Sequence, residues 1–439
     1  MKLSQQRPEK ILFITRKFPP SVGGMETAAY ELYNALHGTG QIDLVAWGGS
    51  NKWLPVVYFW LFARAVVSVL VRRPDVILLQ DGVMAPLGWA LKVLSGLPTL
   101  IVIHGLEVTH KNTVYRSLVL PFIKRQTAFA AVSEGTKCAA IAALGPAGKR
   151  VEVIRNGLSD VFYSNKSRRE QLLIVAQETD LPFPRLEHSR VLVTTGRLVK
   201  RKGVSWFVDN VMPRIVIDDP SILYLVAGSG PQRTAIELAI ERNNLTDSVK
   251  LLGRVSHECL KALYNVADVF VMPNVHVPND IEGFGLVAIE AASCGATVVA
   301  SDLDGISDAV VNGMNGYLVP AGDASAYICI IARELAKRSQ SPSAVRRYTL
   351  DHYSWTESAR TYRSLARSLA LNGTVRPESS TDNVHVTDQP GRRDERIHPL
   401  TGVGSGQGEV TWVGGGDALP PSLDLDGAAT AGHLDELPD

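Results

Sequence analysis

Residues 269–300 read VFVMPNVHVPNDIEGFGLVAIEAASCGATVVA, and this stretch decides the fold. It contains a short apolar run at 269–272, a polar loop, a segment of helix composition at 286–294, and a second apolar run at 297–300. Strands that are buried on both faces are continuously apolar, and parallel neighbours need a crossover, which is usually a helix. The stretch therefore predicts a strand–helix–strand unit of a parallel sheet.

The same alternation extends in both directions along the chain. A polar, proline-containing segment at 164–189 divides it into two series, as expected for two α/β domains, each a doubly wound Rossmann-like sheet, facing a cleft. The strands expected in the first series are 11–15, 42–46, 76–79, 100–103 and 128–132, and those in the second are 191–195, 222–227, 249–252, 269–272 and 297–300.

The composition of the segments also predicts where the domains begin and end. Strand-like and helix-like patterns stop near residue 373, and the glycine- and proline-rich remainder is typical of a disordered tail. The expected parts are an N-terminal Rossmann-like domain (1–165), a linker (166–189), a C-terminal Rossmann-like domain (190–350), a C-terminal helix (351–372), and a disordered acidic tail (373–439).

Charge and cysteine content exclude several classes of function. Residues 373–439 carry 12 acidic and 4 basic residues, which leaves the rest of the chain with nine excess positive charges. A basic body suits an anionic ligand or an anionic membrane surface, but without dense Lys/Arg tracts it does not predict nucleic-acid binding. The four cysteines are scattered and form no C-x-x-C pair, so we expect no metal site, no disulfide framework and a cytoplasmic location.

One segment, residues 53–71, approaches the length of a membrane span. Arg64 lies in its middle, which favours a packed or membrane-surface helix over a span. Both a core helix and a helix that docks on the membrane remain open. The residues that would dock are Trp53, Tyr58, Phe59 and Trp60, beside Arg64, Arg72 and Arg73.

The most specific motif for chemistry is Glu282-Gly-Phe-Gly-Leu-Val-Ala-Ile-Glu290. Its glycines let a ligand approach the backbone, and the start of the following helix offers free N–H groups to an anion. Glu282 and Glu290 can both face one elongated ligand, one holding sugar hydroxyls and the other a ribose diol. These residues predict a site at the start of that helix.

The second motif is Gly196-Arg-Leu-Val-Lys-Arg-Lys-Gly203, directly after an expected strand. Cations at the carboxyl end of a strand are placed to neutralise a pyrophosphate. We expect phosphate contact from Arg197 and Lys202, and a solvated turn at Lys200 and Arg201.

Weaker signals follow other expected strands. The pair Gly23–Gly24 is neither a Walker A motif nor G-x-G-x-x-G. His104 is either a structural histidine or part of the site, and the turn at Gly228 and Gly230 has room for a base or phosphate. Two further segments, 131–134 and 154–157, are expected to be structural.

These five spaced motifs resemble the retaining glycosyltransferases of the GT-B fold, in the group that contains phosphatidylinositol mannosyltransferases and sucrose synthases. The resemblance covers residues 10–370. It implies that domain 1–165 binds the acceptor, that domain 190–350 binds the nucleotide sugar, and that the helix 351–372 returns to the N-terminal domain. It implies that Arg197 and Lys202 bind the donor diphosphate in place of a metal ion, that Glu282 contacts the transferred sugar and Glu290 the ribose, and that His104 lies near the reacting sugar. It also implies backbone contacts to the donor from Gly23, Gly24, Phe284, Gly285 and Leu286.

The resemblance implies a function as well. We expect a retaining, metal-independent enzyme without a cofactor that moves a hexosyl group, with mannose from GDP-mannose first, from a nucleotide sugar to a lipid or glycan acceptor in cell-envelope or exopolysaccharide biosynthesis. UDP-glucose or UDP-N-acetylglucosamine as the donor, a GT-B epimerase and a non-catalytic sugar-nucleotide-binding scaffold are the alternatives. The expected location is the cytoplasm or the inner face of the cytoplasmic membrane.

Overall fold

A computed structural model describes residues 9–373 except 22, 50, 160 and 161. The predicted acidic tail therefore lies outside the described residues from 374 onward. The expected domain boundaries stay a prediction.

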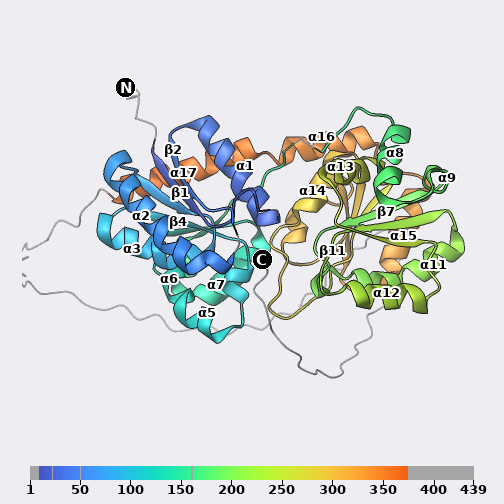
Figure 1. The fold of residues 1–439 in the computed structure, drawn as a ribbon, viewed down its shortest axis with the longest axis horizontal. Helices are drawn as coiled ribbons and strands as arrows, with labels where there is room; N and C mark the ends of the chain where they lie inside the picture. The colour runs from blue at the N-terminus through green and yellow to red at the C-terminus, as the bar shows by residue number, and fades with distance from the viewer. Residues whose placement is uncertain (1–8, 22, 50, 160–161, 374–439) are drawn as a thin grey trace, which may run out of the picture. The chain divides into compact units, whose positions relative to one another are not determined.

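The first sheet has six parallel strands in the order β2-β1-β3-β4-β5-β6 (Figure 1). Its strands are β1 (Ile11–Thr15), β2 (Ile42–Ala46), β3 (Val76–Leu79), β4 (Thr99–Ile103), β5 (Ala128–Ala131) and β6 (Val151–Val153). The helices between and after them are α1 (Gly24–Thr39), α2 (Leu54–Arg72), α3 (Ala85–Ser95), α4 (Leu106–Thr109), α5 (Thr113–Leu118), α6 (Leu120–Ile123) and α7 (Glu134–Leu144), with 3₁₀ turns η1 (Asn51–Trp53), η2 (Gly82–Met84) and η3 (Gly145–Arg150).

The second sheet is also parallel and six-stranded, in the order β12-β11-β10-β7-β8-β9. Its strands are β7 (Arg190–Thr195), β8 (Ile222–Ala227), β9 (Val249–Gly253), β10 (Val269–Met272), β11 (Thr297–Asp302) and β12 (Gly316–Pro320). Its helices are α8 (Arg168–Thr179), α9 (Phe183–Glu187), α10 (Val204–Asn210), α11 (Met212–Asp218), α12 (Arg233–Arg242), α13 (His257–Val266), α14 (Leu286–Ser293), α15 (Ala324–Ala336) and α16 (Pro342–His352), with 3₁₀ turns η4 (Lys200–Lys202) and η5 (Asp304–Asp308). The last described helix, α17 (Trp355–Gly373), packs against the first sheet's α1.

The predicted α/β class with two Rossmann-like sheets is confirmed. All ten expected strands are present, and the structure adds β6 and β12 at the sheet edges. In the second sheet the chain starts at β7, winds outward through β8 and β9, and returns to β10 on the other side of β7. Ligands of doubly wound sheets bind where the strand order reverses, outside the carboxyl ends of the strands. A ligand-binding site is therefore expected at the carboxyl ends of β7 and β10.

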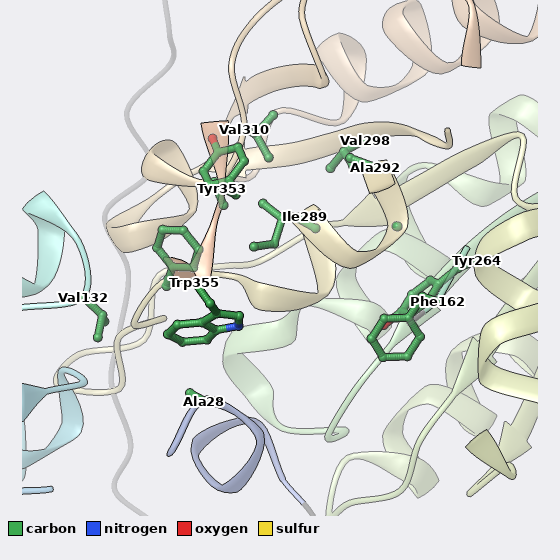
Figure 2. Packing of buried hydrophobic residues seen from close by; sticks show 14 of the residues in the cluster. Ala28, Val132, Phe162, Tyr264, Ile289, Ala292, Val298, Val310, Tyr353 and Trp355 are labelled. Carbon is green, nitrogen blue, oxygen red and sulfur yellow. The ribbon is translucent and has the colours of Figure 1, made fainter. Parts of the chain in front are cut away.

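Alternating side chains of each strand face two apolar layers, as the two-residue period of a strand requires. In β1, Ile11 and Phe13 belong to the cluster that contains Leu32 of α1, whereas Leu12 and Ile14 belong to the cluster that contains Leu61 of α2. The first of these clusters continues through Trp355 to α14, and Figure 2 shows Trp355 between α14 and Ala28 of α1. Apolar packing thus joins helices of both sheets.

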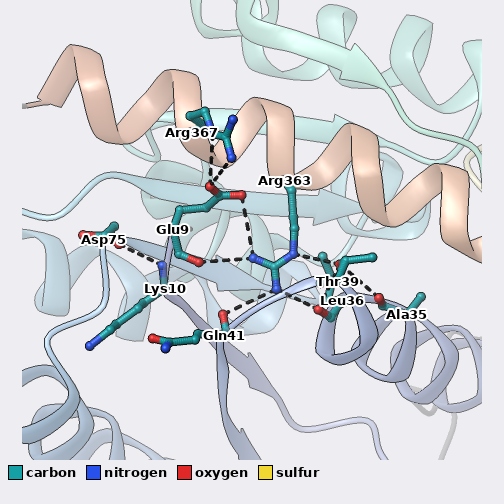
Figure 3. A network of polar contacts seen from close by, with 9 residues as sticks. All are labelled: Glu9, Lys10, Ala35, Leu36, Thr39, Gln41, Asp75, Arg363 and Arg367. Carbon is teal, nitrogen blue, oxygen red and sulfur yellow. Dashed lines mark hydrogen bonds and ion pairs between the residues drawn. The ribbon is translucent and has the colours of Figure 1, made fainter. Parts of the chain in front are cut away.

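The last described helix, α17, packs against α1 through a buried arginine (Figure 3). The Arg363 guanidinium donates to the carbonyl of Leu36 (2.7 Å) and to the hydroxyl of Thr39 (2.8 Å) at the end of α1. It also donates to the backbone carbonyl of Glu9 (3.1 Å), whose carboxylate binds Arg367 (3.1 Å). Arg363 therefore donates to the carbonyl of Leu36, one of the last four carbonyls of α1, which accept no backbone N–H within the helix.

One described helix, α2, is long and apolar enough to cross a membrane by length and composition. Only 22% of its most apolar window is buried. The fully buried residues are Val57, Leu61, Ala65 and Ser68, and partly buried residues pack against the same core, namely Tyr58, Phe62, Val66 and Val69.

We expect Arg363→Ala to lower the free energy of unfolding by about 3–5 kcal/mol, because it leaves the buried Glu9 carboxylate and two buried carbonyls without this partner. Arg367→Ala is the matched control: its side chain is 52% exposed, and its removal leaves the buried Glu9 carboxylate beside Arg363, so we expect a smaller loss of about 1 kcal/mol. Urea unfolding of both variants checks this. Equal losses would contradict the special role of Arg363.

Candidate active site

Loops that follow β7, β8 and β10 are tied together at the switch point of the second sheet. The amide of Leu198, after β7, donates to the carbonyl of Ser229, after β8 (3.0 Å). The amide of Val275, after β10, donates to the carbonyl of Arg201 (2.9 Å). The segments that carry the predicted cations and Glu282 thus form one hydrogen-bonded assembly.

Glycines make this close packing of loops feasible. Gly203 has φ +64°, and a Cβ there would lie 1.8 Å from the Pro273 carbonyl oxygen. A Cβ at Gly228 would lie 1.8 Å from the Gly196 oxygen, and one at Gly230 would lie 2.4 Å from the Leu198 oxygen. Close packing of the loops therefore explains why glycine occupies these positions. The contact of Gly228 and Gly230 with a nucleotide stays a prediction.

The Glu282 carboxylate is the centre of an ion network. Its Oε2 lies 2.6 Å from Nζ of Lys202 and 3.4 Å from Nε of Arg201, and it accepts a hydrogen bond from Nδ2 of Asn274 (3.1 Å). Burial alone would raise the pKa of Glu282, but the charges of Lys202 and Arg201 outweigh it and bring the pKa down to about 2. Glu282 is therefore ionised at neutral pH.

Arg201 corrects one expectation from the sequence, because it does not lie in a solvated turn. Its side chain is 20% exposed, and its Nη1 lies 2.9 Å from a carboxylate oxygen of Asp280. The sequence suggested a basic surface turn because three cations stand in a row. The adjacent acidic loop after β10 draws Arg201 inward, whereas Lys200 is exposed.

Arg197 and Lys202 differ in their surroundings. Lys202 is 9% exposed and bound to Glu282. Arg197 is exposed, and none of the carboxylates in the described part of the chain pairs with it. An ammonium has three N–H donors, so the Lys202–Glu282 bond leaves two for a ligand. The geometry thus leaves both cations able to meet an anion.

Glu290 lies on α14 with a different partner and a different pKa. Its Oε2 accepts from the hydroxyl of Tyr264 (2.7 Å), which is also 2.9 Å from the hydroxyl of Thr195. Burial raises the pKa of Glu290 to about 7, against the opposing effects of Tyr264 and of the Lys202 charge. Lys202 therefore acts electrostatically on both glutamates.

The start of α14 follows directly from the Glu282 loop. Gly285 is its N-cap with φ +90°, a conformation that favours glycine. No side chain of the described residues caps this helix end. Leu286 is the first helical residue, and the 3%-exposed Phe284 packs its ring edge-on against Tyr353. The predicted amide contacts of these three residues with a donor remain untested.

His104 lies at the end of β4 beside the Glu282 loop. Its Nε2 is 2.9 Å from the Gln80 carbonyl, which can only accept, so Nε2 carries the proton and Nδ1 is left as the acceptor in the neutral ring. A Cβ on Gly283 would lie 2.3 Å from the His104 carbonyl oxygen. The structure thus brings His104 next to the loop that carries Glu282.

Gly23 and Gly24 lie at the start of α1. An added Cβ at Gly24 would meet nothing within 4 Å, and one at Gly23 would lie 2.4 Å from the Glu26 carboxylate, which pairs with Lys17 (3.0 Å). Among the residues that the structure describes, no hydrogen bond or ion pair connects this pair of glycines to either glutamate of the site. Their expected place beneath the diphosphate stays a prediction.

Sequence reasoning missed four residues of this assembly. Asn274 and Arg201 bind the Glu282 carboxylate, Tyr264 binds Glu290, and Asp304 accepts from the amide of Glu282 (3.0 Å). Asn274 and Asp304 each follow an apolar strand, which is the signal that could have found them. Tyr264 lies inside a helix with no local motif.

Metal-binding groups of three or more His, Cys, Asp or Glu are absent from the described part of the chain. Metal independence stays a prediction.

Comparisons with known proteins show which family and fold the chain resembles. A family model described as "Glycosyl transferases group 1" matches residues 189–337, and one described as "Glycosyltransferase Family 4" matches residues 22–160. Glycogen synthase of Mycobacterium tuberculosis is 27% identical over 311 residues, which is 67% of this chain and 70% of that protein. Phosphatidyl-myo-inositol mannosyltransferase of Mycobacterium leprae is 31% identical over 174 residues, 38% of this chain and 44% of that protein.

Solved structures share the fold at low sequence identity. The crystal structure of Anabaena HepE in complex with UDP and glucose has a TM-score of 0.63 at 19% identity, covering 82% of this chain and all of that one. Sucrose-phosphate synthase from Thermosynechococcus elongatus has a TM-score of 0.64 at 21% identity, covering 83% of this chain and all of that one.

The two glutamates should affect stability differently with pH. The folded-state pKa of Glu290 is about 7 and its ordinary value is 4.5, so the folded protein holds this proton more tightly and loses stability as pH rises from about 4.5 to 7. We expect Glu290→Gln to stabilise the protein relative to wild type by about 1–3 kcal/mol more at pH 8 than at pH 5. Urea unfolding at both values measures this.

Glu282→Gln serves as the matched control for this experiment. Because the pKa of Glu282 is depressed to about 2, its stabilising ionisation is lost only as pH falls below about 4.5. Its effect should be destabilising and the same at pH 5 and pH 8. A pH-independent effect of Glu290→Gln would show that the raised pKa is wrong.

Proposed function

Because this chain belongs to the glycosyltransferases of the GT-B fold, we propose that it moves a hexosyl group from a nucleotide sugar to a lipid or glycan acceptor, with retention and without a metal ion. The observation that carries the proposal is the charge arrangement at the switch point of the second sheet. An exposed Arg197, with no carboxylate partner among the described residues, and a buried Lys202 lie in the same loop, next to a carboxylate that is ionised at neutral pH.

The cations suit a departing diphosphate. Negative charge grows on the diphosphate as the bond to the anomeric carbon breaks, and preorganised cations stabilise that charge more in the transition state than in the ground state. The uncapped start of α14 adds N–H groups and the positive end of its dipole. These groups supply the charge that a metal ion would otherwise supply, which supports a metal-independent reaction.

The carboxylates suit hydroxyl groups. Every partner of the Glu282 carboxylate in the described residues binds Oε2, so Oε1 is available to accept from sugar hydroxyls. Likewise, Tyr264 binds Oε2 of Glu290, which leaves Oε1 for a ribose diol. We assign Glu282 to the sugar and Glu290 to the ribose of one donor.

For the donor we propose GDP-mannose first. The loop of residues 273–282, between β10 and Glu282, resembles that of the mannosyltransferase branch, and a mannosyltransferase is among the relatives. UDP-glucose is the second candidate, because HepE has been crystallised with UDP and glucose. The experiment is to incubate the protein with GDP-mannose, UDP-glucose and UDP-N-acetylglucosamine, with and without EDTA, and to measure nucleotide release and the fate of the sugar.

We expect nucleotide release to survive EDTA, and Arg197→Ala and Lys202→Ala each to lower kcat by about 100-fold, by analogy with the loss of an oxyanion donor. Lys200→Ala is the matched control, because this exposed neighbour has no assigned role. Loss of activity with EDTA, or wild-type kcat in Arg197→Ala, would contradict the proposed mechanism. Release of an epimerised sugar would show that the enzyme isomerises the donor sugar and does not transfer it.

The α2 helix supports a lipid acceptor and a peripheral place on the inner face of the cytoplasmic membrane. Phe59 is 79%, Leu70 68% and Trp53 63% exposed, away from the buried side of the helix. Arg64 and Arg72 are exposed on the same helix. Large apolar side chains beside cations are typical of helices that lie in the surface of an anionic bilayer.

We expect the protein to sediment with vesicles that contain about 30% phosphatidylglycerol, and Phe59→Ser/Leu70→Ser to weaken this binding at least tenfold. Ile217→Ser, which alters an equally exposed residue (79%) of α11, should leave binding unchanged. If wild type and the double variant bind vesicles equally, α2 does not make the proposed membrane contact.

A further inference from the structure

The first turn of α7 contacts the loop that carries Glu282. The helix follows β5 of the first sheet, whereas the loop follows β10 of the second sheet. Ser133 is the N-cap of α7, and its oxygen accepts from the amide of Thr136 (3.0 Å). The Ser133 hydroxyl donates to the carbonyl of Gly283 (2.7 Å), and so does the hydroxyl of Thr136 (3.1 Å). Both side chains are fully buried. One carbonyl next to Glu282 thus receives two hydroxyl donors from the first sheet's domain.

The backbone of Glu282 itself is held by η5. Its amide donates to Asp304 (3.0 Å), and its carbonyl accepts from the amide of Gly305 (3.0 Å). At its other end η5 also meets α7, because Asp308 accepts from the amide of Glu134 (2.9 Å) at the positive end of the helix dipole. The start of α7 therefore contacts both the Glu282 loop and the turn that supports it.

These segments approach one another backbone to backbone. A Cβ on Gly305 would lie 2.0 Å from the Gly283 oxygen, and a Cβ on Gly283 would meet the His104 oxygen. No side chain fits between them, so a shift of Gly283 has to move its neighbours as well. The Glu282 loop consequently has little freedom while its contacts with α7 are made.

We propose that Ser133 and Thr136 are positioning residues, which hold residues 282–285 in the shape that contacts the donor sugar. The proposal rests on the proposed function, in which Glu282 binds that sugar. It separates two parts of donor affinity: the sugar part depends on hydroxyls from the other domain, whereas the nucleotide part depends on Arg197, Lys202 and Glu290.

The test is the double variant Ser133→Ala/Thr136→Val, which removes both hydroxyls. Calorimetry compares GDP with GDP-mannose, and UDP with UDP-glucose. We expect the Kd of the free diphosphate to change less than twofold, the Kd of the nucleotide sugar to rise at least fivefold, and kcat/KM to fall about tenfold. Thr136→Ser with Ser133 intact, which keeps both hydroxyls, should restore wild-type values.

Ser341→Ala is the matched control. Ser341 caps α16 as Ser133 caps α7, accepting from the amide of Ala344 (3.2 Å). Among the described residues, the contacts of its hydroxyl stay within its own helix start. The control should leave every binding constant unchanged. Equal effects in both variants, or an unchanged nucleotide-sugar Kd in the double variant, would overturn the proposal.

Hydrogen exchange gives a readout that needs no activity. Amides of residues 281–286 should exchange at least tenfold faster in the double variant and at the wild-type rate in Ser341→Ala. If the wild-type protein binds no nucleotide sugar, the proposed function fails, and exchange alone decides the positioning role. Unchanged exchange in residues 281–286 would overturn that role.

Discussion

The buried ion pair between Lys202 and Glu282 is the constraint on which the rest of the site depends. An ionised carboxylate out of water costs several kcal/mol unless it is paired and hydrogen-bonded. Lys202, Arg201 and Asn274 supply those partners on one oxygen. To bring them there, the loops after β7 and β10 must touch, and Gly203 lets them. The packing of the loops and the charge of the site are therefore one feature, set before any ligand arrives.

The two glutamates show how environment separates identical side chains. Glu282 faces two cations and has a pKa of about 2, whereas Glu290 has a tyrosine hydroxyl, a more distant cation and a pKa of about 7. Glu282 can only accept hydrogen bonds at neutral pH, while Glu290 exchanges a proton there. Their spacing along the chain does not carry this difference. It arises because burial dominates at Glu290, whereas the charges of Lys202 and Arg201 outweigh burial at Glu282.

The sequence predicted most of the fold because buried parallel strands are continuous apolar runs. It missed β6, which has three residues and carries Glu152, and β12, which begins with Gly316 and ends with Pro320. Arg197 and His104 were found because each follows such an apolar run, whereas Asn274 and Asp304, which also follow strands, were missed. Arg201 was misjudged and Tyr264 missed because their partners lie 81 and 26 residues away in the chain, and local pattern says nothing of such contacts.

Ser133 shows why a local explanation of a residue can be correct and incomplete. Its segment was expected to be structural, and the serine does cap a helix. A cap, however, uses a lone pair of the hydroxyl oxygen and leaves the O–H free to donate. Here that proton goes to Gly283, 150 residues along the chain. Because one hydroxyl contacts a helix start in one domain and a loop in the other, explaining the cap leaves its O–H donor unassigned. That donor joins the two domains.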